Sequence, residues 1–138
     1  ICIDPDFKEA HTKLLQKLSV PPEYALKVAG GAYDLCQPVK TVGQLFLTEQ
    51  ILMLVNHHQK HAPIPSVPLS LHKDCARFNE REAEACEKDE EVFAVFMFRR
   101  GMANILAGFK TRRGRGRQLN ISCYWINFQG SHRLTIKM

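Results

Sequence analysis

The segment 110–117 reads Lys-Thr-Arg-Arg-Gly-Arg-Gly-Arg, and its side chains are suited to binding anions. Arg guanidinium groups bind phosphate through paired hydrogen bonds and also stack on nucleic-acid bases. The interleaved glycines carry no side chain, so the backbone of this loop can follow a phosphate strand or enter a groove. The segment predicts a phosphate-binding loop. The alternatives are a solvated loop without a ligand and a nuclear-localisation signal.

The distribution of charge points to the same end of the chain. Residues 1–91 hold ten Lys+Arg and all 14 Asp+Glu, whereas residues 92–138 hold nine Lys+Arg and no acid, giving formal charges of −4 and +9. So sharp a split predicts a surface that attracts polyanions. The residues expected to contact nucleic acid are Arg99, Arg100, Lys110, Arg112, Arg113, Arg115, Arg117, Tyr124, Arg133 and Lys137.

Aromatic residues follow the basic segment closely. Tyr124, Trp125 and Phe128 fall on or just after a predicted strand. An exposed ring among them, with Tyr124 as the first candidate, would offer a flat surface on which a base can stack. The alternative is that these rings lie in the core beneath the basic loop.

Histidines and cysteines in the middle of the chain have the chemistry of zinc ligands. His72 and Cys75 are separated by two residues, and Cys86 follows ten residues later. A fourth ligand would come from the earlier cluster of His57, His58 and His61. Structural zinc sites usually combine two short ligand pairs, and only one occurs here. We therefore prefer buried cysteines without a metal or cofactor, and keep His72, Cys75 and Cys86 as candidates.

The chain lacks the sequence patterns of common enzymes. It contains no phosphate loop ending in GK[ST], no HExxH and no GxSxG, so we predict a binding domain without catalytic residues. Five cysteines without a CxxC pair favour reduced thiols and an intracellular protein, nuclear or cytoplasmic. The glycosylation sequon Asn120-Ile-Ser122 keeps secretion as an alternative.

Helices are the elements expected first. Asp4 followed by Pro5 is typical of a helix start, and the apolar positions over 7–18 repeat as on one helical face. A short second helix is expected over 23–29. The capping-box spacing of Thr41 and Gln44 predicts a third helix, continuing to Val55 in the core.

Strands are expected after residue 91. Residues 92–99 are a continuous apolar run rich in Val and Phe, and 105–111 would form the next strand; one long helix over 90–109 is the alternative. Apolar and polar residues alternate over 119–125 and again over 133–138, on either side of a turn. The last two strands therefore predict an antiparallel hairpin.

These elements predict an α+β fold, with a helical N-terminal half packed on a C-terminal antiparallel β-sheet or hairpin. We expect a single domain that covers residues 1–138. Within it we expect a helical region at 1–58, a Pro-rich linker at 59–71, a charged helix at 72–91 and a basic β-rich region at 92–138. The linker should be extended, partly polyproline II, and make few backbone hydrogen bonds.

The function favoured by the sequence is non-enzymatic binding of RNA or DNA, mainly through phosphates. One alternative is a protein-interaction module, such as a regulatory or viral accessory domain, with an acidic partner. Its contacts would be the charged helix or the PxxP motif Pro65–Pro68. A second alternative is a secreted glycan-binding protein. The longest apolar run, 92–98, is too short to span a membrane, and no oligomeric state is predicted.

Overall fold

The computed structural model describes residues 1–38, 40–73, 75, 89–113 and 118–138, with only the backbone described at 112 and 113. Helical elements come first in the chain, and the strands follow. The elements are η1 (Pro5–Phe7), α1 (Lys8–Lys17), η2 (Pro22–Tyr24), η3 (Asp34–Cys36), α2 (Val42–His58), β1 (Ser66–His72), α4 (Glu90–Arg113), β2 (Asn120–Asn127) and β3 (Gly130–Leu134).

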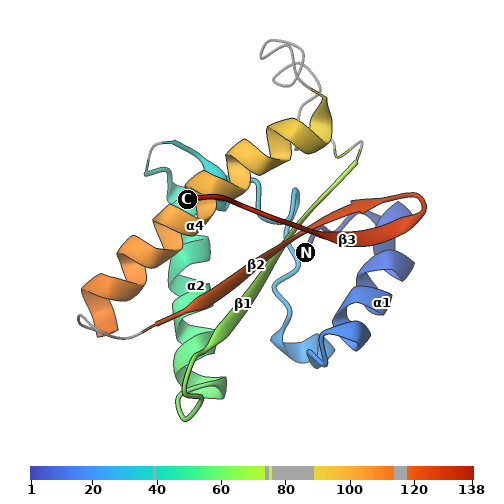
Figure 1. Cartoon of the computed structure of the whole chain (residues 1–138). Helices are drawn as coiled ribbons and strands as arrows, with labels where there is room; N and C mark the ends of the chain where they lie inside the picture. Colours follow the sequence, from blue (N-terminus) through green and yellow to red (C-terminus); the bar gives the residue numbers. More distant parts are fainter. Residues whose placement is uncertain (39, 74, 76–88, 114–117) are drawn as a thin grey trace.

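The sheet has three strands in the order β1-β2-β3 (Figure 1). Strands β2 and β3 are antiparallel, with Tyr124 opposite Arg133, so the expected hairpin is confirmed. Strand β1 runs parallel to β2, with Ser70 in register with Tyr124. A parallel neighbour requires a crossover connection, and α4 lies in that connection. The chain therefore has an α+β fold with a mixed sheet.

The expectation of strands over 92–111 is wrong, because α4 occupies this segment as the alternative long helix. Its buried side chains recur every three or four residues, as on one helical face. They are Phe93, Ala94, Met97, Phe98, Ile105 and Phe109. The apolar run 92–98 resembled a strand only because two exposed side chains, Val92 and Phe96, are also apolar.

The expectation of a linker over 59–71 is wrong for its second half, where β1 forms. Seven residue pairs join β1 to β2, so this segment does not lack backbone partners. Pro68 is tolerated because β1 is an edge strand, where one missing N–H need not break the sheet. The Gln59 side chain fixes the strand start, donating to the Ser66 carbonyl at 3.0 Å and accepting from its N–H at 2.7 Å. Of the charged helix expected over 72–91, residues 76–88 lie outside the described residues.

Helix starts in the first half follow the expected capping. Asp4 accepts a hydrogen bond from the Asp6 N–H at 3.0 Å and begins η1, which leads into α1. The Thr41 hydroxyl accepts from the Gln44 N–H at 3.1 Å and begins α2. The second helix expected over 23–29 is wrong, since only the turn η2 forms there.

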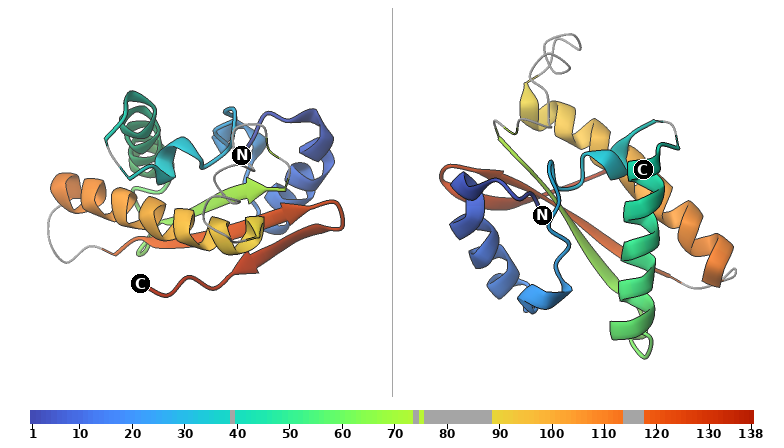
Figure 2. Two further views of the ribbon diagram at one scale, coloured as in Figure 1. Left: turned by 90° about the horizontal axis from the view of Figure 1, so that it is seen from above. Right: turned by 180° about the vertical axis from the view of Figure 1, so that it is seen from behind.

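Helix α4 packs on one face of the sheet and α1 on the other (Figure 1). Viewed from behind, β1 runs between α1 and α2 (Figure 2). Every second residue of β1, at 67, 69 and 71, joins the core with α4 and α2. On the opposite face Tyr124 and Ile126 pack with Phe7 and Leu14. The two faces therefore have separate cores.

Among the described helices, one segment is long and apolar enough to cross a membrane by length and composition alone. It is Glu90–Thr111 within α4, with a mean hydropathy of 1.3. In the fold this helix supplies four fully buried side chains to the main core, at 94, 97, 98 and 105. The described residues thus show no clear membrane span.

Candidate functional site

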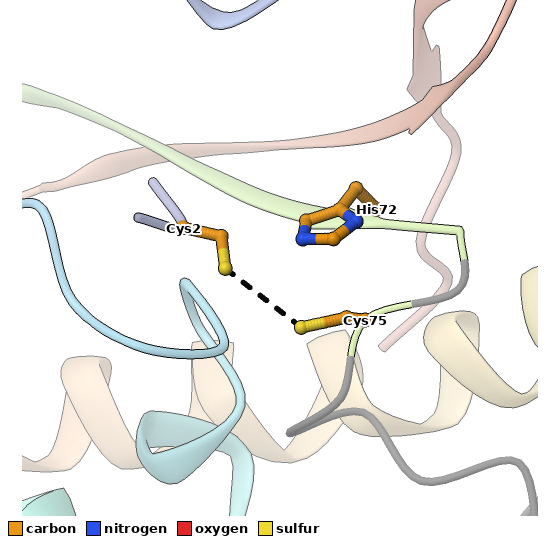
Figure 3. Close-up of side chains that lie close together, drawn as sticks. All are labelled: Cys2, His72 and Cys75. Carbon is orange, nitrogen blue, oxygen red and sulfur yellow. Dashed lines mark hydrogen bonds between the residues drawn. The ribbon is translucent and has the colours of Figure 1, made fainter. Parts of the chain in front are cut away.

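The structure brings two of the candidate metal ligands, His72 and Cys75, next to a third residue, Cys2. One ligand atom from each lies within 4.8 Å of the other two, and all three side chains are buried (Figure 3). Cys86 lies outside the described residues. Sequence reasoning missed Cys2, because no short spacing links it to the other two.

A turn of two glycines positions Cys2. The backbone of Cys2 forms an isolated parallel bridge with Val28, and Gly30 and Gly31 follow with φ of 85° and 58°. These left-handed conformations favour glycine. The turn aims the Gly30 N–H at the Cys2 sulfur, to which it donates at 3.2 Å. The thiol is thereby fixed beside the end of β1.

His72 is the last residue of β1, and its ring orientation is fixed by the backbone. Its Nδ1 lies 2.7 Å from the Lys73 carbonyl oxygen. A carbonyl can only accept, so Nδ1 carries the proton and Nε2 has a free lone pair. Nε2 is buried and has no hydrogen-bond partner among the described residues, and Asp4 Oδ2 lies 3.9 Å away.

The surroundings of this cluster are apolar and exclude water. The Phe7 ring centroid lies 4.2 Å from that of His72, and the His11 ring meets His72 edge-on at 6.2 Å. Burial lowers the pKa of His11 from 6.5 to about 4, and the positive N-terminus and His72 act in the same direction. The cluster thus joins neutral imidazole and thiol groups in a dry environment, which suits a soft cation.

The earlier histidines do not complete this cluster. His58 stacks on Tyr24 at 3.9 Å instead, and His57 lies beside it at the end of α2. Together with His61, these side chains are exposed. The expectation that one of them supplies the fourth ligand is therefore wrong for the described arrangement.

The basic residues lie on two separate surfaces. Arg99 and Lys110 are exposed on the same face of α4, because eleven residues are close to three full turns. Arg133 lies on the opposite side of the sheet, and Lys137 is exposed beyond β3. Arg100 is half-buried, and its Nε has no hydrogen-bond partner among the described residues.

The four arginines of the loop cannot be placed in the same detail. Only the backbone of Arg112 and Arg113 is described, at the end of α4. Arg115 and Arg117 lie outside the described residues.

Two of the three candidate stacking rings are buried. Tyr124 and Trp125 retain 6% and 3% exposure, so the expectation of Tyr124 as an open stacking surface is wrong. Each packs into one of the two cores, on opposite faces of the sheet. Phe128 is 66% exposed at the hairpin turn and stacks on Phe7 at 5.2 Å. It is therefore the accessible ring of the three.

A pocket of about 590 Å³ lies between α1 and α2, over the sheet face that carries Tyr124. Its volume is in the range of small-molecule sites. Leucines of α1, together with Ile51 and Leu54 of α2, form apolar walls, and Arg133 belongs to the lining. Ser70 also lines it, and its buried hydroxyl has no hydrogen-bond partner among the described residues. No sequence pattern predicted this pocket.

No protein-family model, curated protein or solved structure matches this chain.

Proposed function

We propose that this chain is a non-enzymatic nucleic-acid-binding domain that contacts phosphates through α4 and the Arg/Gly segment after it. The observation that carries the proposal is the exposed, acid-free face of α4 bearing Arg99 and Lys110. Eleven residues of helix place these two cations about 16 Å apart along the axis. The same helix runs directly into the segment 112–117, which holds four more arginines.

The charge along α4 is polarised. Its acids, Glu90 and Glu91, stand in the first turn, and no acid follows before the end of the chain. Glu91 is paired with His132 at 2.9 Å. Cations in the last turn also stabilise the helix dipole, which explains Lys110 without any ligand. That explanation does not extend to Arg99 in the middle of the helix.

Binding of this kind has defined properties. Phosphate contacts release counterions, so affinity should fall steeply as salt increases and depend little on sequence. RNA and DNA are both suitable partners, and an acidic protein surface is the alternative partner. Exposed Phe128 lies at the hairpin turn, away from the end of α4, so base stacking there is not required (Figure 1).

The experiment compares two double variants with equal loss of charge. Arg99→Gln with Lys110→Gln should weaken binding of short RNA and DNA oligonucleotides and reduce the salt dependence by about two phosphate contacts. Lys17→Gln with Lys27→Gln removes two exposed cations outside the acid-free third and should leave both unchanged. Equal losses in the two variants would mean that only net charge matters and would overturn the assignment to α4.

A second candidate function rests on the pocket. We propose that it binds a single-chain amphiphile with an anionic head. The apolar walls suit the chain of such a ligand, whereas Arg133 and the Ser70 hydroxyl suit its head. This function would use Arg133 in a role unrelated to nucleic acid.

Displacement of a fluorescent long-chain carboxylate tests this candidate. Leu54→Gln should weaken binding at least several-fold, whereas Met53→Gln, its neighbour outside the pocket lining, should not. Arg133→Gln should weaken the carboxylate but not the corresponding alcohol. Equal binding by both α2 variants would reject the pocket as the site.

A further inference from the structure

We propose that Cys2, His72 and Cys75 bind Zn²⁺, with the Asp4 carboxylate as the fourth ligand. Two thiolates, one neutral imidazole and one carboxylate form a donor set that zinc prefers. The ion would tie the first residues of the chain to the end of β1, 73 residues away in sequence. The site is closed and buried, as structural zinc sites are.

The distance between the two sulfur atoms supports a shared metal. The sulfur atoms of Cys2 and Cys75 lie 3.8 Å apart. Two thiolates bonded to one zinc at about 2.3 Å, with a tetrahedral angle between them, stand roughly 3.8 Å apart. A disulfide would place them at about 2.05 Å. The two side chains are therefore already spaced as ligands of a single ion.

The state of His72 supports the same conclusion. Zinc-bound histidines usually donate their second ring N–H to a carbonyl or carboxylate, which fixes the tautomer. His72 has this arrangement, with Nδ1 at 2.7 Å from the Lys73 carbonyl. The remaining nitrogen, Nε2, is buried and without a hydrogen-bond partner among the described residues. A buried acceptor without a partner is costly, and a metal ion would satisfy it.

Two further groups favour the charged ligands. The Gly30 N–H, 3.2 Å from the Cys2 sulfur, stabilises the thiolate form through a hydrogen bond. Asp4 uses one carboxylate oxygen to cap η1, while the other faces His72 Nε2 at 3.9 Å. A shift of a few tenths of an ångström would bring that oxygen to the spacing of a zinc ligand. The donor set thus comes from groups that the backbone already holds in place.

The test uses the metal alone as probe, on the full chain prepared under reducing conditions. One zinc per chain should be retained, and Co²⁺ should replace it with the absorption of a tetrahedral site containing two thiolates. Cys2→Ser and Cys75→Ser should each lower zinc affinity at least 100-fold and reduce the thiolate-to-cobalt absorption. Asp4→Asn, which can still cap the helix, should lower affinity about tenfold.

Cys36→Ser and Cys123→Ser are the matched controls, since both remove a buried thiol elsewhere in the core. They should retain one zinc per chain. Should a ligand variant fail to fold, the melting temperature of the wild type still decides, because it should rise with zinc and fall with chelator. Absence of zinc from the reduced wild type, with no shift in melting temperature, would overturn the proposal. A Cys2–Cys75 disulfide that persists in reductant would do the same.

Discussion

The backbone of Gly31 lies so close to the Ser70 carbonyl that a Cβ added to Gly31 would stand 2.7 Å from that oxygen. The neighbouring Ala32 N–H donates to the same oxygen at 3.1 Å. This contact holds the glycine turn, and with it Cys2, against the edge of β1. The turn and the strand are therefore one packing unit, although they are far apart in the sequence.

Gly31→Ala should destabilise the fold strongly. Its φ of 58° costs about 1–3 kcal/mol for a side chain, and the clash with Ser70 adds to this. Gly130→Ala is the control, because φ is 137° there but nothing lies within 4 Å of the added Cβ. Urea unfolding should give a larger loss at Gly31 than at Gly130. Equal losses would show that the close approach to Ser70 is unimportant.

Stability should fall in mild acid because of His11. Burial lowers the pKa of His11 to about 4 in the folded chain, against 6.5 for an ordinary histidine. The unfolded chain therefore binds the extra proton first, and stability decreases as the pH falls from about 6.5 through 4. The full loss is about 3 kcal/mol, and above pH 6.5 this group adds no slope. The groups facing it are the N-terminus, His72 and Asp4.

His11→Phe should flatten this region of the stability curve, measured by urea unfolding at several pH values. His61→Gln changes an exposed histidine and should keep the wild-type slope. An unchanged slope in His11→Phe would assign the acid sensitivity to another group.

Cys36 and Cys123 should resist alkylation in the folded protein. Burial raises the pKa of Cys123 to about 12 and raises that of Cys36 further, so almost no thiolate exists at neutral pH. Iodoacetamide labelling at pH 8, followed by peptide mass spectrometry, should find both unmodified until urea is added. Labelling of either at the rate of a denatured chain would contradict their burial in the core.

The Asn104 side chain should contribute to stability by joining α4 to η3. Its Nδ2 donates to the carbonyls of Leu35 and Gln37 at 2.9 and 3.2 Å. Asn104→Leu removes the donor and should cost about 1–3 kcal/mol. Asn56→Leu, an exposed site on α2, should cost little. Urea midpoints of the two variants test this, and similar values would argue against the link.

The α+β class and the hairpin could be predicted from the sequence because they depend on local patterns. Strand alternation over 120–126 and the glycine at 130 define β2 and the turn. Helix α4 could not be separated from a strand in the same way. A short apolar run fits either element, and the choice depends on packing against α2 and the sheet.

The candidate metal centre was only partly predictable. The short spacing of His72 and Cys75 identified two ligands, whereas Cys2 reaches them through a bridge to Val28 and the glycine turn. Such long-range contacts leave no local signal. The burial of Tyr124 was equally hidden, because alternation shows that a residue faces one side of a sheet but not that α1 covers that side.

The most direct test of nucleic-acid binding is fluorescence anisotropy of short single- and double-stranded RNA and DNA at two salt concentrations. The wild type is compared with a variant in which Arg112, Arg113, Arg115 and Arg117 are Gln. A control variant carries Gln at four exposed lysines elsewhere, Lys8, Lys17, Lys27 and Lys60. We predict salt-sensitive binding that the arginine variant loses and the lysine variant keeps. No binding by the wild type at low salt, or equal binding by all three proteins, would contradict the proposed function.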